Sequence, residues 1–521
     1  MPADRKVIGV RWVYKIKYNR LGEITRFKAR LVAQGFAQIP GQDFNVAFAP
    51  VMLMRHVRYM LARAARLGHE LDSIDFSNAY LHGELDKEVY LRMPPGYEDV
   101  GHVCKLLRGL YGLVQSGRLW NEKLNKILED LGFVRSTVDF SIYIRKSDGV
   151  ALAIYCDDTL ISAPTKDAIK HFKDELSKTD LKFTSPDDFN EILGVAVDRR
   201  ADGSIHFHQA HYVQRMLDDF GFADCDPNGK ANTPWVKSVS YAEGGERTTL
   251  PYSSLLGRLL WLANTSRPDI AWAVGKASRR AHMPTDMCYS RLKRICAYLK
   301  GTITRGIIFR AGDAEGWERI MVFTDSDWAG DVTRRSCSGV LVFYNGCPIA
   351  WHSKMQTICG RSVTAVSSGE AEFYAFANGV KYGLGFRSIM KLFDDLETDT
   401  PTAHIMQDTK ATAVADYPVW KSHDRAPDGS VSGPATSVAS DSTVALHMAK
   451  NPTTFKSRHM DIRVQFVRDA VDYQQVVPKK VDTNWQPADL MTKAVTGAQH
   501  RRLFPILSGT GQCPATHDIF K

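Results

Sequence analysis

Acidic residues stand together at two separate places in the sequence. In the first, Asp157 and Asp158 are adjacent between two apolar runs, residues 150–156 and 159–162. This pattern predicts a β-hairpin with both acids at its tip. Two neighbouring carboxylates repel each other unless a cation offsets their charge, and Mg²⁺ prefers carboxylate and phosphate oxygens as ligands. The pair therefore suggests a metal-dependent site for phosphoryl transfer; the simpler interpretation is a polar β-turn.

A third carboxylate for this site is available in residues 69–75, which are typical of a short strand. The segment carries Asp72 and Asp75, whose side chains must point to opposite faces because they are three residues apart on a strand. Only one of them can face the hairpin. Two divalent ions held about 3.5–4 Å apart by such carboxylates can activate an attacking hydroxyl and stabilise a leaving pyrophosphate.

The second acidic group centres on Asp325 and Glu372. Asp325 ends a predicted strand, and Glu372 lies near the start of a helix predicted over about 368–396. Ser367 and Glu370 have the spacing of an N-terminal capping box, which gives Glu370 a structural role. Glu372 lies about 200° further around the helix, so it is free to reach a metal beside Asp325. The alternative is a helix cap followed by a solvent-exposed glutamate.

The surrounding pattern predicts the elements that position these acids. Strands are predicted over residues 10–18, 27–33, 190–197, 320–325, 339–344, 349–351 and 403–407. Helices are predicted over residues 57–67, 119–131, 167–176, 255–262, 270–280 and 289–299. Residues 226–250 are typical of a loop, and the Gly, Ser and Pro content of residues 422–440 indicates a flexible insertion.

Composition excludes several classes of protein. With 521 residues, 44% hydrophobic and 24% charged, the chain is typical of a globular protein of about three domains. No uncharged apolar run reaches the roughly 18–20 residues that span a bilayer. Nine scattered cysteines without a C-x-x-C motif argue against a disulfide framework or a zinc finger. The net charge is +9, and residues 1–30 carry nine Lys or Arg against two acids, which favours contact with a polyanion or a solvated amphipathic hairpin.

Several motifs in order resemble the reverse transcriptase of copia-type LTR retrotransposons. They occupy residues 74–83, 110–118, 155–160 and 192–195, and residues 28–36 are similar to the fingers segment of that family. The resemblance implies an α+β right-hand polymerase (fingers, palm, thumb/connection) followed by an RNase H-like α/β domain with a mixed sheet. The implied limits are 1–200 for fingers and palm, 201–315 for thumb/connection and 316–505 for the RNase H-like domain, with an insertion at about 415–440.

The resemblance also implies residue roles. The palm carboxylates are Asp75, Asp157 and Asp158, so that Asp75 is preferred to Asp72. Tyr80 would exclude a ribose 2′-OH, with Ala79 lining the same pocket. Lys28 and Arg30 would neutralise the triphosphate, and Gln115 and Arg118 would lie at the nucleotide. The sequence departs from the family at Val114 and Gly117, where Lys and Pro are common.

Later motifs resemble the RNase H domain of the same elements. They occupy residues 324–330, 351–356, 367–375, 458–463 and 487–493. The implied catalytic and metal-binding residues are Asp325, Glu372, a third Asp, and Asp489. Asp408 is preferred as the third because it ends an apolar strand. Asp441 is the alternative, because residues 440–452 match the family's helix at least as well.

The resemblance implies two Mg²⁺ ions in each active site, with Mn²⁺ as an alternative ion. The implied partners are an RNA template, a DNA primer, an RNA–DNA hybrid and dNTPs, without a membrane, in cytoplasmic virus-like particles or the nucleus. We therefore expect an RNA-directed DNA polymerase with ribonuclease H, a part of a Pol polyprotein without visible protease or integrase motifs. The alternative is a decayed or co-opted fragment that binds nucleic acid without catalysis.

Overall fold

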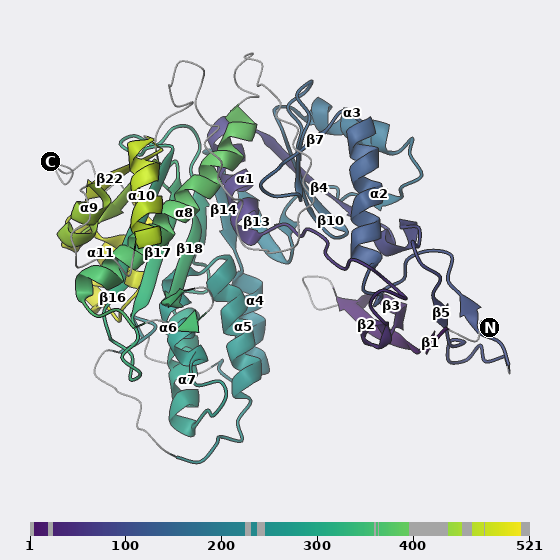
Figure 1. The fold of residues 1–521 in the computed structure, drawn as a ribbon, viewed down its shortest axis with the longest axis horizontal. Coiled ribbons are helices and arrows are strands. Elements are labelled where there is room, and N and C mark those ends of the chain that lie inside the picture. The colour runs from purple at the N-terminus through teal and green to yellow at the C-terminus, as the bar shows by residue number, and fades with distance from the viewer. Residues whose placement is uncertain are drawn as a thin grey trace. The chain divides into compact units, whose positions relative to one another are not determined.

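The chain forms two compact units in the computed structural model. The N-terminal unit comprises Met1–Met52 and Glu70–Phe189, and the C-terminal unit comprises Leu53–His69 and Asn190–Lys521 (Figure 1). The described residues are 5–18, 24–99, 101–223, 231–236, 245–358, 361–362, 364–394, 436–450, 461–473 and 475–511. Helices and several separate sheets are mixed in the chain. The domain limits expected at residues 200 and 315 stay a prediction.

An antiparallel six-stranded sheet forms the core of the N-terminal unit. Its order is β11 (Phe183–Thr184), β4 (Glu70–Phe76), β10 (Asp158–Ala163), β9 (Ala151–Tyr155), β8 (Ile142–Ile144) and β7 (Val134–Arg135). The helices α2 (Ser116–Asp130) and α3 (Lys166–Leu176) cover one face. Ile74, Phe76 and Ile161 of the sheet share one buried cluster with Leu124 and Phe172 of these helices. The predicted acidic hairpin and both predicted helices are confirmed.

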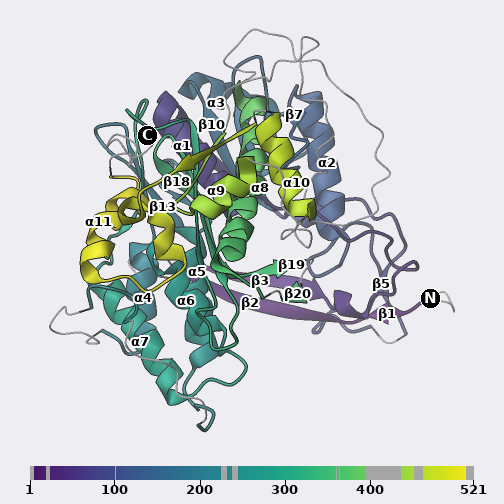
Figure 2. The same cartoon turned by 60° about the vertical axis from the view of Figure 1, so that its left-hand side comes forward.

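A two-stranded ribbon carries the basic residues near the N-terminus. It pairs β2 (Val10–Tyr18) with β3 (Ile24–Ala33), as predicted, and Figure 2 shows both as long strands. Side chains alternate between the faces of a strand, so the register sorts them by chemistry. One face carries Arg11, Lys15, Arg26, Lys28 and Arg30; the other carries Trp12, Tyr14, Ile16, Phe27 and Leu31. A small sheet of β1 (Val7–Ile8), β5 (Tyr90–Leu91) and β6 (Cys104–Lys105) and the short helices η1 (Gly35–Ala37) and η2 (Ala79–His82) complete the elements of this unit.

A four-stranded antiparallel sheet begins the longer part of the C-terminal unit. It consists of β12 (Glu191–Ile192), β13 (Val195–Arg199), β14 (Ile205–His208) and β15 (Gly306–Phe309). The prediction of one strand over residues 190–197 is wrong. Leu193 and Gly194 both have positive φ (53° and 77°), and this left-handed turn makes two paired strands of the segment.

A helical block packs in the same unit. It contains α4 (Ala210–Asp219), α5 (Tyr252–Thr265), η3 (Pro268–Ile270), α6 (Ala271–Ser278) and α7 (Asp286–Lys300), which confirms the three helices predicted between residues 255 and 299. Arg267 and Asp269, each with a side chain 1% exposed, form a bidentate ion pair, with N–O distances of 2.9 and 2.7 Å. The Tyr298 hydroxyl donates to Asp269 (2.6 Å) and lies 3.3 Å from His500 of α11 (Gly497–Leu507).

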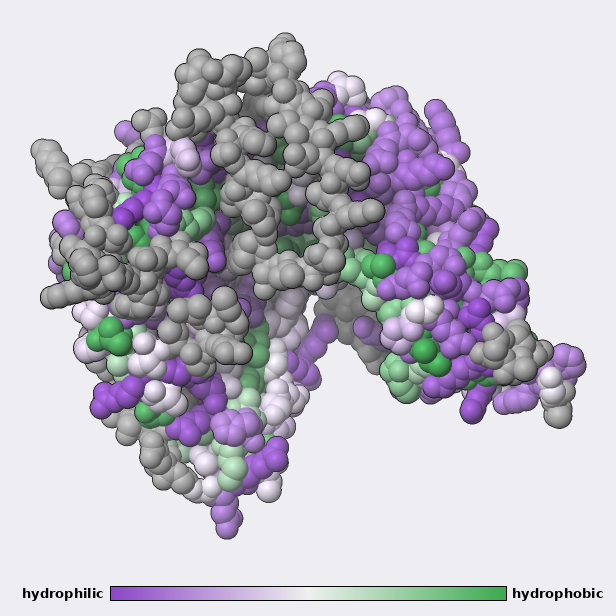
Figure 3. Space-filling model, in the orientation of Figure 1, coloured by the Kyte–Doolittle hydropathy of each residue, from purple (hydrophilic) through white to green (hydrophobic). Residues whose placement is uncertain are grey.

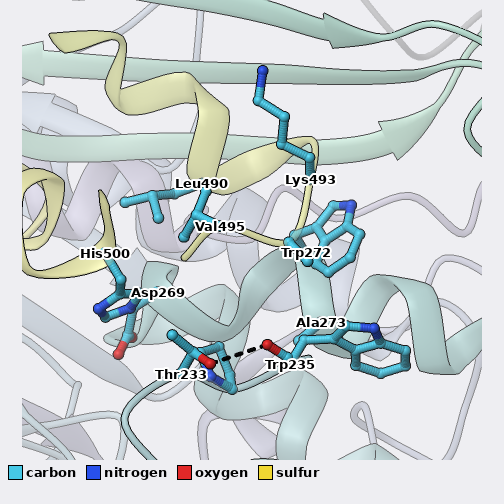
Figure 4. A pocket seen from close by; sticks show the side chains of 11 residues that line it. Thr233, Trp235, Asp269, Trp272, Ala273, Leu490, Lys493, Val495 and His500 are labelled. Carbon is cyan, nitrogen blue, oxygen red and sulfur yellow. Dashed lines mark hydrogen bonds between the residues drawn. The ribbon is translucent and has the colours of Figure 1, made fainter. Parts of the chain in front are cut away.

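This buried polar cluster borders a small cavity of about 20 Å³, where Asp269 and His500 lie beside Trp235, Trp272 and Leu490 (Figure 4). A buried charge that loses its partner is strongly destabilising, so the ion pair stabilises this block. The contact between Tyr298 and His500 links the block to α11, the last described helix.

The second sheet of this unit is a mixed five-stranded sheet, as predicted. Its order is β18 (Cys347–Met355), β17 (Cys337–Tyr344), β16 (Ile320–Asp327), β21 (Thr436–Ser440) and β22 (Val476–Lys480). The first three strands are antiparallel, and β21 is parallel to both β16 and β22. The remaining elements are β19 (Thr357–Ile358), β20 (Arg361–Ser362), α8 (Ser368–Asp394), α9 (Thr443–Lys450), α10 (Asp461–Asp472), η5 (Thr483–Trp485) and η6 (Pro487–Met491).

The long helix α8 packs against β16, β17 and β21. Gly379 makes this close approach feasible, because a Cβ atom there would lie 2.4 Å from Thr324 Cγ2. On β17, Gly339 lies opposite Asp325, and a Cβ atom there would lie 2.8 Å from Met491 Cβ of η6. These two glycines let α8 and η6 approach the strands β16 and β17.

The predicted insertion extends too far toward the C-terminus. Residues 436–440 are a buried strand, β21, paired on both sides, and Val438 is completely buried. The Gly, Ser and Pro content of residues 422–440 suggests a linker, but small and β-branched side chains also suit a strand enclosed between two others and covered by α8. Residues 395–435, which include the strand predicted near 403–407, lie outside the described residues.

The helix α1 (Met54–Leu67), predicted over 57–67, belongs to the C-terminal unit and packs against β18.

Among the helices of the described residues, none combines the length and apolar composition needed to cross a lipid bilayer. Figure 3 shows hydrophilic side chains over most of the visible face of the N-terminal unit, with hydrophobic ones scattered between them.

Candidate active sites

The β9–β10 hairpin positions the first carboxylate group, which consists of Asp75, Asp157 and Asp158. Asp158 begins β10 directly opposite Asp75 of β4, so both residues lie on the same face of the sheet. Asp157 lies in the two-residue turn, and its carbonyl accepts a hydrogen bond from the Phe76 backbone N–H (2.8 Å). The hairpin tip is therefore fixed to the end of β4, next to Asp75.

The structure separates Asp75 from Asp72, as the spacing predicts. Asp72 forms an ion pair with Lys173 of α3 and accepts a hydrogen bond from the Ser73 backbone N–H (2.7 Å). It therefore lies toward the helices, on the same face as Ile74. Asp75 lies on the other face and is exposed. Asp72 has a structural partner, whereas Asp75 is on the face that Asp158 shares.

Aromatic residues and a cation surround the first carboxylate group. The ring of Tyr80 packs edge-on against that of Tyr111 (5.0 Å), and the guanidinium of Arg30 lies over the Tyr111 ring (5.0 Å). Burial raises the pKa of Tyr111, Arg30 acts against this rise, and the negative charges of Asp157 and Asp75 add to it. The structure thus brings Arg30, Tyr80 and two of the predicted carboxylates around Tyr111. Tyr111 lies within the motif at residues 110–118 but received no role from the sequence.

The turn residue Cys156 links this aromatic group to the hairpin. Its φ of +56° is in the left-handed region that non-glycine residues rarely adopt. The Tyr80 hydroxyl donates to its sulfur (3.5 Å), and the Trp120 indole donates to its carbonyl (2.9 Å). Burial raises the pKa of Tyr80 well above its usual range, so the phenol stays protonated and keeps this contact. Ala79, beside Tyr80, is buried.

Gln115 and Arg118 have protein partners in this conformation. Gln115 is fully buried, accepts a hydrogen bond from Gln38 and donates one to the Asp43 carbonyl, each 2.9 Å long. Arg118 donates to Glu122 (2.8 Å) and contacts Asp86. Lys28 lies opposite Lys15 on the basic face of the ribbon. The nucleotide-binding roles of these residues stay a prediction. Gly117 does not prevent α2 from beginning at Ser116.

The second carboxylate group consists of Asp325, Glu372 and Asp441. One oxygen from each lies within 4.8 Å of the others. The only other described residues that meet this criterion are Asp198, His206 and His208, so the first carboxylate group does not converge as closely in this conformation. Asp325 lies near the end of β16, Glu372 in the first turns of α8, and Asp441 immediately after β21. Two neighbouring strands, β16 and β21, and the helix α8 packed against them therefore place three acids at one point.

Helix capping orients Glu372 as predicted. Ser367 Oγ accepts a hydrogen bond from the Glu370 backbone N–H (3.1 Å), and the Glu370 carboxylate accepts one from the Val366 N–H (2.7 Å). In a capping box, the Glu370 carboxylate would accept from the backbone N–H of the cap residue Ser367. Here it accepts from the residue before the cap. Gln356 donates to the Ala371 carbonyl (2.8 Å) and to Ser338 (2.9 Å), which holds the start of α8 to the sheet.

Among the described residues, Asp441, the alternative third carboxylate, joins Asp325 and Glu372. Asp408 lies outside the described residues. Asp408 is preferred from the sequence because it ends an apolar strand, but Asp441 also follows a strand, since β21 ends at Ser440. The sequence signal of β21 is weak because Ser and Thr occupy positions where apolar residues would indicate a buried strand.

Asp489 lies at the edge of this group, on η6. Its carboxylate pairs with Lys493 (2.8 Å), whose ammonium is also 3.7 Å from Asp325. Thr492 donates a hydrogen bond to Asp325. Burial and then the charge of Asp441 raise the pKa of Asp489, while Lys493 acts against them. Lys493 was missed from the sequence, although its place four residues after Asp489 on a helical turn is the spacing of an ion pair.

The residues of the second group fit a divalent cation. Burial is the larger cause that raises the pKa of Asp325 to about 7 and that of Glu372 to about 9. The negative charges of neighbouring carboxylates are the second cause. Glu372 Oε2 is buried and has no hydrogen-bond partner among the described residues. A hard divalent cation would supply the missing partner and offset the repulsion between oxygen ligands. The donor set, all carboxylates, suits Mg²⁺ or Mn²⁺.

These shifts predict how the stability of the metal-free protein depends on pH. Both pKa values lie above those of an unfolded chain, so the folded state binds more protons. The contribution of these two carboxyl groups to the free energy of unfolding is then fully present below about pH 4. It is lost as the pH rises through about 7 for Asp325 and about 9 for Glu372. We expect the melting temperature in EDTA to fall between pH 5 and 9, by about 2–4 °C for each kcal/mol lost. Mg²⁺ should raise it more at pH 9 than at pH 5.

The variant Glu372→Gln is the control for this prediction, measured by thermal unfolding in the same buffers. It removes one titrating carboxylate and one ligand, so the fall with pH and the response to Mg²⁺ should both shrink. A variant with the same pH profile and the same Mg²⁺ response as the parent chain would contradict the prediction.

Comparison with known proteins identifies the family. Residues 1–236 match the model of the reverse transcriptase (RNA-dependent DNA polymerase) family. The Pol polyprotein of transposon TNT 1-94 from Nicotiana tabacum is 30% identical over 514 residues, covering 95% of this chain and 35% of the relative. The Pol polyprotein of transposon RE1 from Arabidopsis thaliana is 35% identical over 72% of this chain and 25% of the relative. The chain belongs to the reverse transcriptase region of copia-type retrotransposon Pol polyproteins.

Other matches differ in coverage. The putative transposon Ty5-1 protein of Saccharomyces cerevisiae is 29% identical, covering 58% of this chain and 97% of the relative. The chain spans only about a quarter to a third of the plant Pol polyproteins it matches. Among solved structures, a fusion of an RNase H domain from Mycobacterium tuberculosis with maltose-binding protein matches at 10% identity, over 37% of this chain and 98% of that one, with a TM-score of 0.19, which is too low to support an argument.

Proposed function

We propose that the chain is an RNA-directed DNA polymerase with ribonuclease H activity that copies retrotransposon RNA into DNA. The observation that carries the polymerase proposal is the register of the acidic hairpin, which puts Asp158 opposite Asp75 and Asp157 at the adjoining turn. Residues directly opposite on antiparallel strands have Cβ atoms about 4.5–5.5 Å apart, so rotation of the side chains suffices to bring these carboxylates to a common cation. Family membership supports the same reading.

The chain's own groups have distinct roles in this proposal. Asp75, Asp157 and Asp158 would hold two Mg²⁺ ions, which lower the pKa of the attacking primer hydroxyl and neutralise the leaving pyrophosphate. Arg30 and Lys28, both on the basic face of the ribbon, would bind the triphosphate. Tyr80, held by Tyr111 and Cys156, would block a ribose 2′-OH with its ring and so select dNTPs. Gln115 would brace the backbone around the nucleotide through Gln38 and Asp43.

The ribonuclease H proposal rests on the second carboxylate group. Asp325, Glu372 and Asp441 would hold the cations, with Asp489 as a fourth acid. Lys493, between Asp489 and Asp325, offsets part of the negative charge and keeps both carboxylates in place. The expected substrate is the RNA strand of an RNA–DNA hybrid, which leaves the DNA copy intact. The proposed domains are fingers and palm, thumb/connection, and an RNase H-like domain.

Primer extension tests the polymerase proposal. The full chain is given a labelled DNA primer on an RNA template, dNTPs and Mg²⁺, and Asp157→Asn serves as the matched inactive variant. We expect extension by the parent chain that EDTA abolishes and that the variant lacks. Binding of the primer–template in a gel-shift assay without any extension by the parent chain would contradict the proposal and favour a non-catalytic nucleic-acid-binding fragment.

A further inference from the structure

Two histidines and an aspartate converge on the β13–β14 hairpin of the C-terminal unit, a place to which no role has been given so far. Asp198 of β13 lies directly opposite His206 of β14, and His208 is two residues further along the same strand. All three side chains therefore share one face of the sheet. One potential ligand atom from each lies within 4.8 Å of the other two.

Neighbouring contacts fix the two rings. Ile205 and Phe207 are completely buried on the opposite face, so the alternation along β14 determines where His206 and His208 point. The imidazole rings are stacked, with centroids 4.4 Å apart and planes 28° apart. Gly306 of β15 lies opposite His208, and a Cβ atom there would be 2.7 Å from His208 Cβ. A glycine at this position is what allows the neighbouring strand to approach His208 so closely.

The donor set differs from that of the carboxylate groups. Two imidazoles and one carboxylate are the ligands of many zinc sites, and three protein ligands leave a position for water. Imidazole suits Zn²⁺, Cu²⁺ and Ni²⁺, whereas Mg²⁺ is held by oxygen ligands. A neutral imidazole ring keeps a lone pair on one nitrogen for a metal. Arg200 is the nearby cation that acts against metal binding.

We propose that Asp198, His206 and His208 form a binding site for a zinc-class divalent cation that clips β13 to β14. In the metal-free chain, His208 Nε2 lies 2.6 Å from Asp198 Oδ2, and His208 Nδ1 accepts a long hydrogen bond from the Ala210 N–H (3.3 Å). The cation takes the place of the proton between His208 and Asp198. The proton moves from Nε2 to Nδ1 as the ring changes tautomer. The metal replaces the hydrogen bond between His208 and Asp198, and the long contact with Ala210 is given up because two donors would then face each other.

Calorimetry and electron paramagnetic resonance test this proposal on the tag-free full chain. Zn²⁺ is titrated in the presence of excess Mg²⁺, which occupies the all-carboxylate sites. We expect near-stoichiometric uptake of one Zn²⁺ per chain and an affinity reduced by at least about tenfold in the double variant H206Q/H208Q. His171→Gln, an exposed histidine beside Glu175, is the matched control and should bind Zn²⁺ like the parent chain.

Substoichiometric Cu²⁺ gives a second readout that needs no variant. Splitting of its spectrum by two nitrogen nuclei is expected from His206 and His208, and a carboxylate site has no such nitrogens. Zn²⁺ affinity unchanged in the double variant, or a Cu²⁺ spectrum without two-nitrogen splitting, would overturn the proposal. Neither measurement depends on polymerase or ribonuclease activity, so its outcome is independent of the function proposed above.

Discussion

Replacing Asp441 by Asn should slow cleavage of RNA in an RNA–DNA hybrid by at least about 10²-fold, the scale at which loss of one electrostatic stabiliser slows an enzyme. Asp441 shares a cluster with Asp325 and Glu372, and the charge of Asp441 contributes to the raised pKa of Glu372. An amide in its place cannot supply the charge that a divalent cation needs. The measurement is the single-turnover rate of cleavage of a labelled RNA strand with Mg²⁺.

Asp408→Asn is the matched control for this prediction. The cluster has its three carboxylates without Asp408, so this variant should cleave at nearly the rate of the parent chain. Both variants should extend a primer normally, since the first carboxylate group belongs to the N-terminal unit. The opposite pattern, with cleavage lost in Asp408→Asn and kept in Asp441→Asn, would show that the third ligand is Asp408.

Replacing Asp75 by Asn should reduce RNA-templated DNA synthesis by at least about 10²-fold, again because one charge at the reacting phosphates is lost. Asp75 lies opposite Asp158 on the face of the sheet away from α2 and α3. The rate of single-nucleotide addition to a labelled primer is the appropriate measurement. Cleavage of RNA in a preformed hybrid should be unaffected.

Asp72→Asn provides the comparison on the same strand. Asp72 pairs with Lys173 and lies toward α3, so its loss removes a partly exposed ion pair worth at most about 1 kcal/mol. Nucleotide addition should remain within a few-fold of the parent rate. Equal loss of addition in the two variants would contradict the assignment of Asp75, because the effect would then come from damage to β4 in general.

The sequence predicted those site residues whose position depends on local periodicity. Alternation along one strand places Asp72 and Asp75 on opposite faces, and the family resemblance prefers Asp75; Glu372 follows from its offset from the helix cap at Ser367. The strand β4 and the start of the helix α8 are both marked by clear local patterns in the sequence. The structure confirms the faces on which these acids lie. The predicted acidic hairpin is confirmed for the same reason, because apolar runs on either side of Asp157 and Asp158 define it.

Features that depend on long-range contacts could not be predicted. Asp441 is recognisable as a candidate ligand only once β21 is paired between β16 and β22, and its pairing with β16 joins segments more than a hundred residues apart. Tyr111 gains its place from Arg30 and Tyr80 on other segments. The left-handed conformation of Leu193 has no sequence signature of its own, and Gly194 was the one local signal of a break in the strand.

The position of β21 in the mixed sheet also constrains the order of assembly. The antiparallel strands β16, β17 and β18 can pair as soon as they are synthesised, but β16 then has an unpaired edge until residues 436–440 emerge. Unpaired edges invite pairing with other chains, so this intermediate is exposed to aggregation during translation. The length of the connection before β21 adds little to the free energy of closure, about 0.6 kcal/mol for each doubling, and its main effect is on the time that the edge stays open.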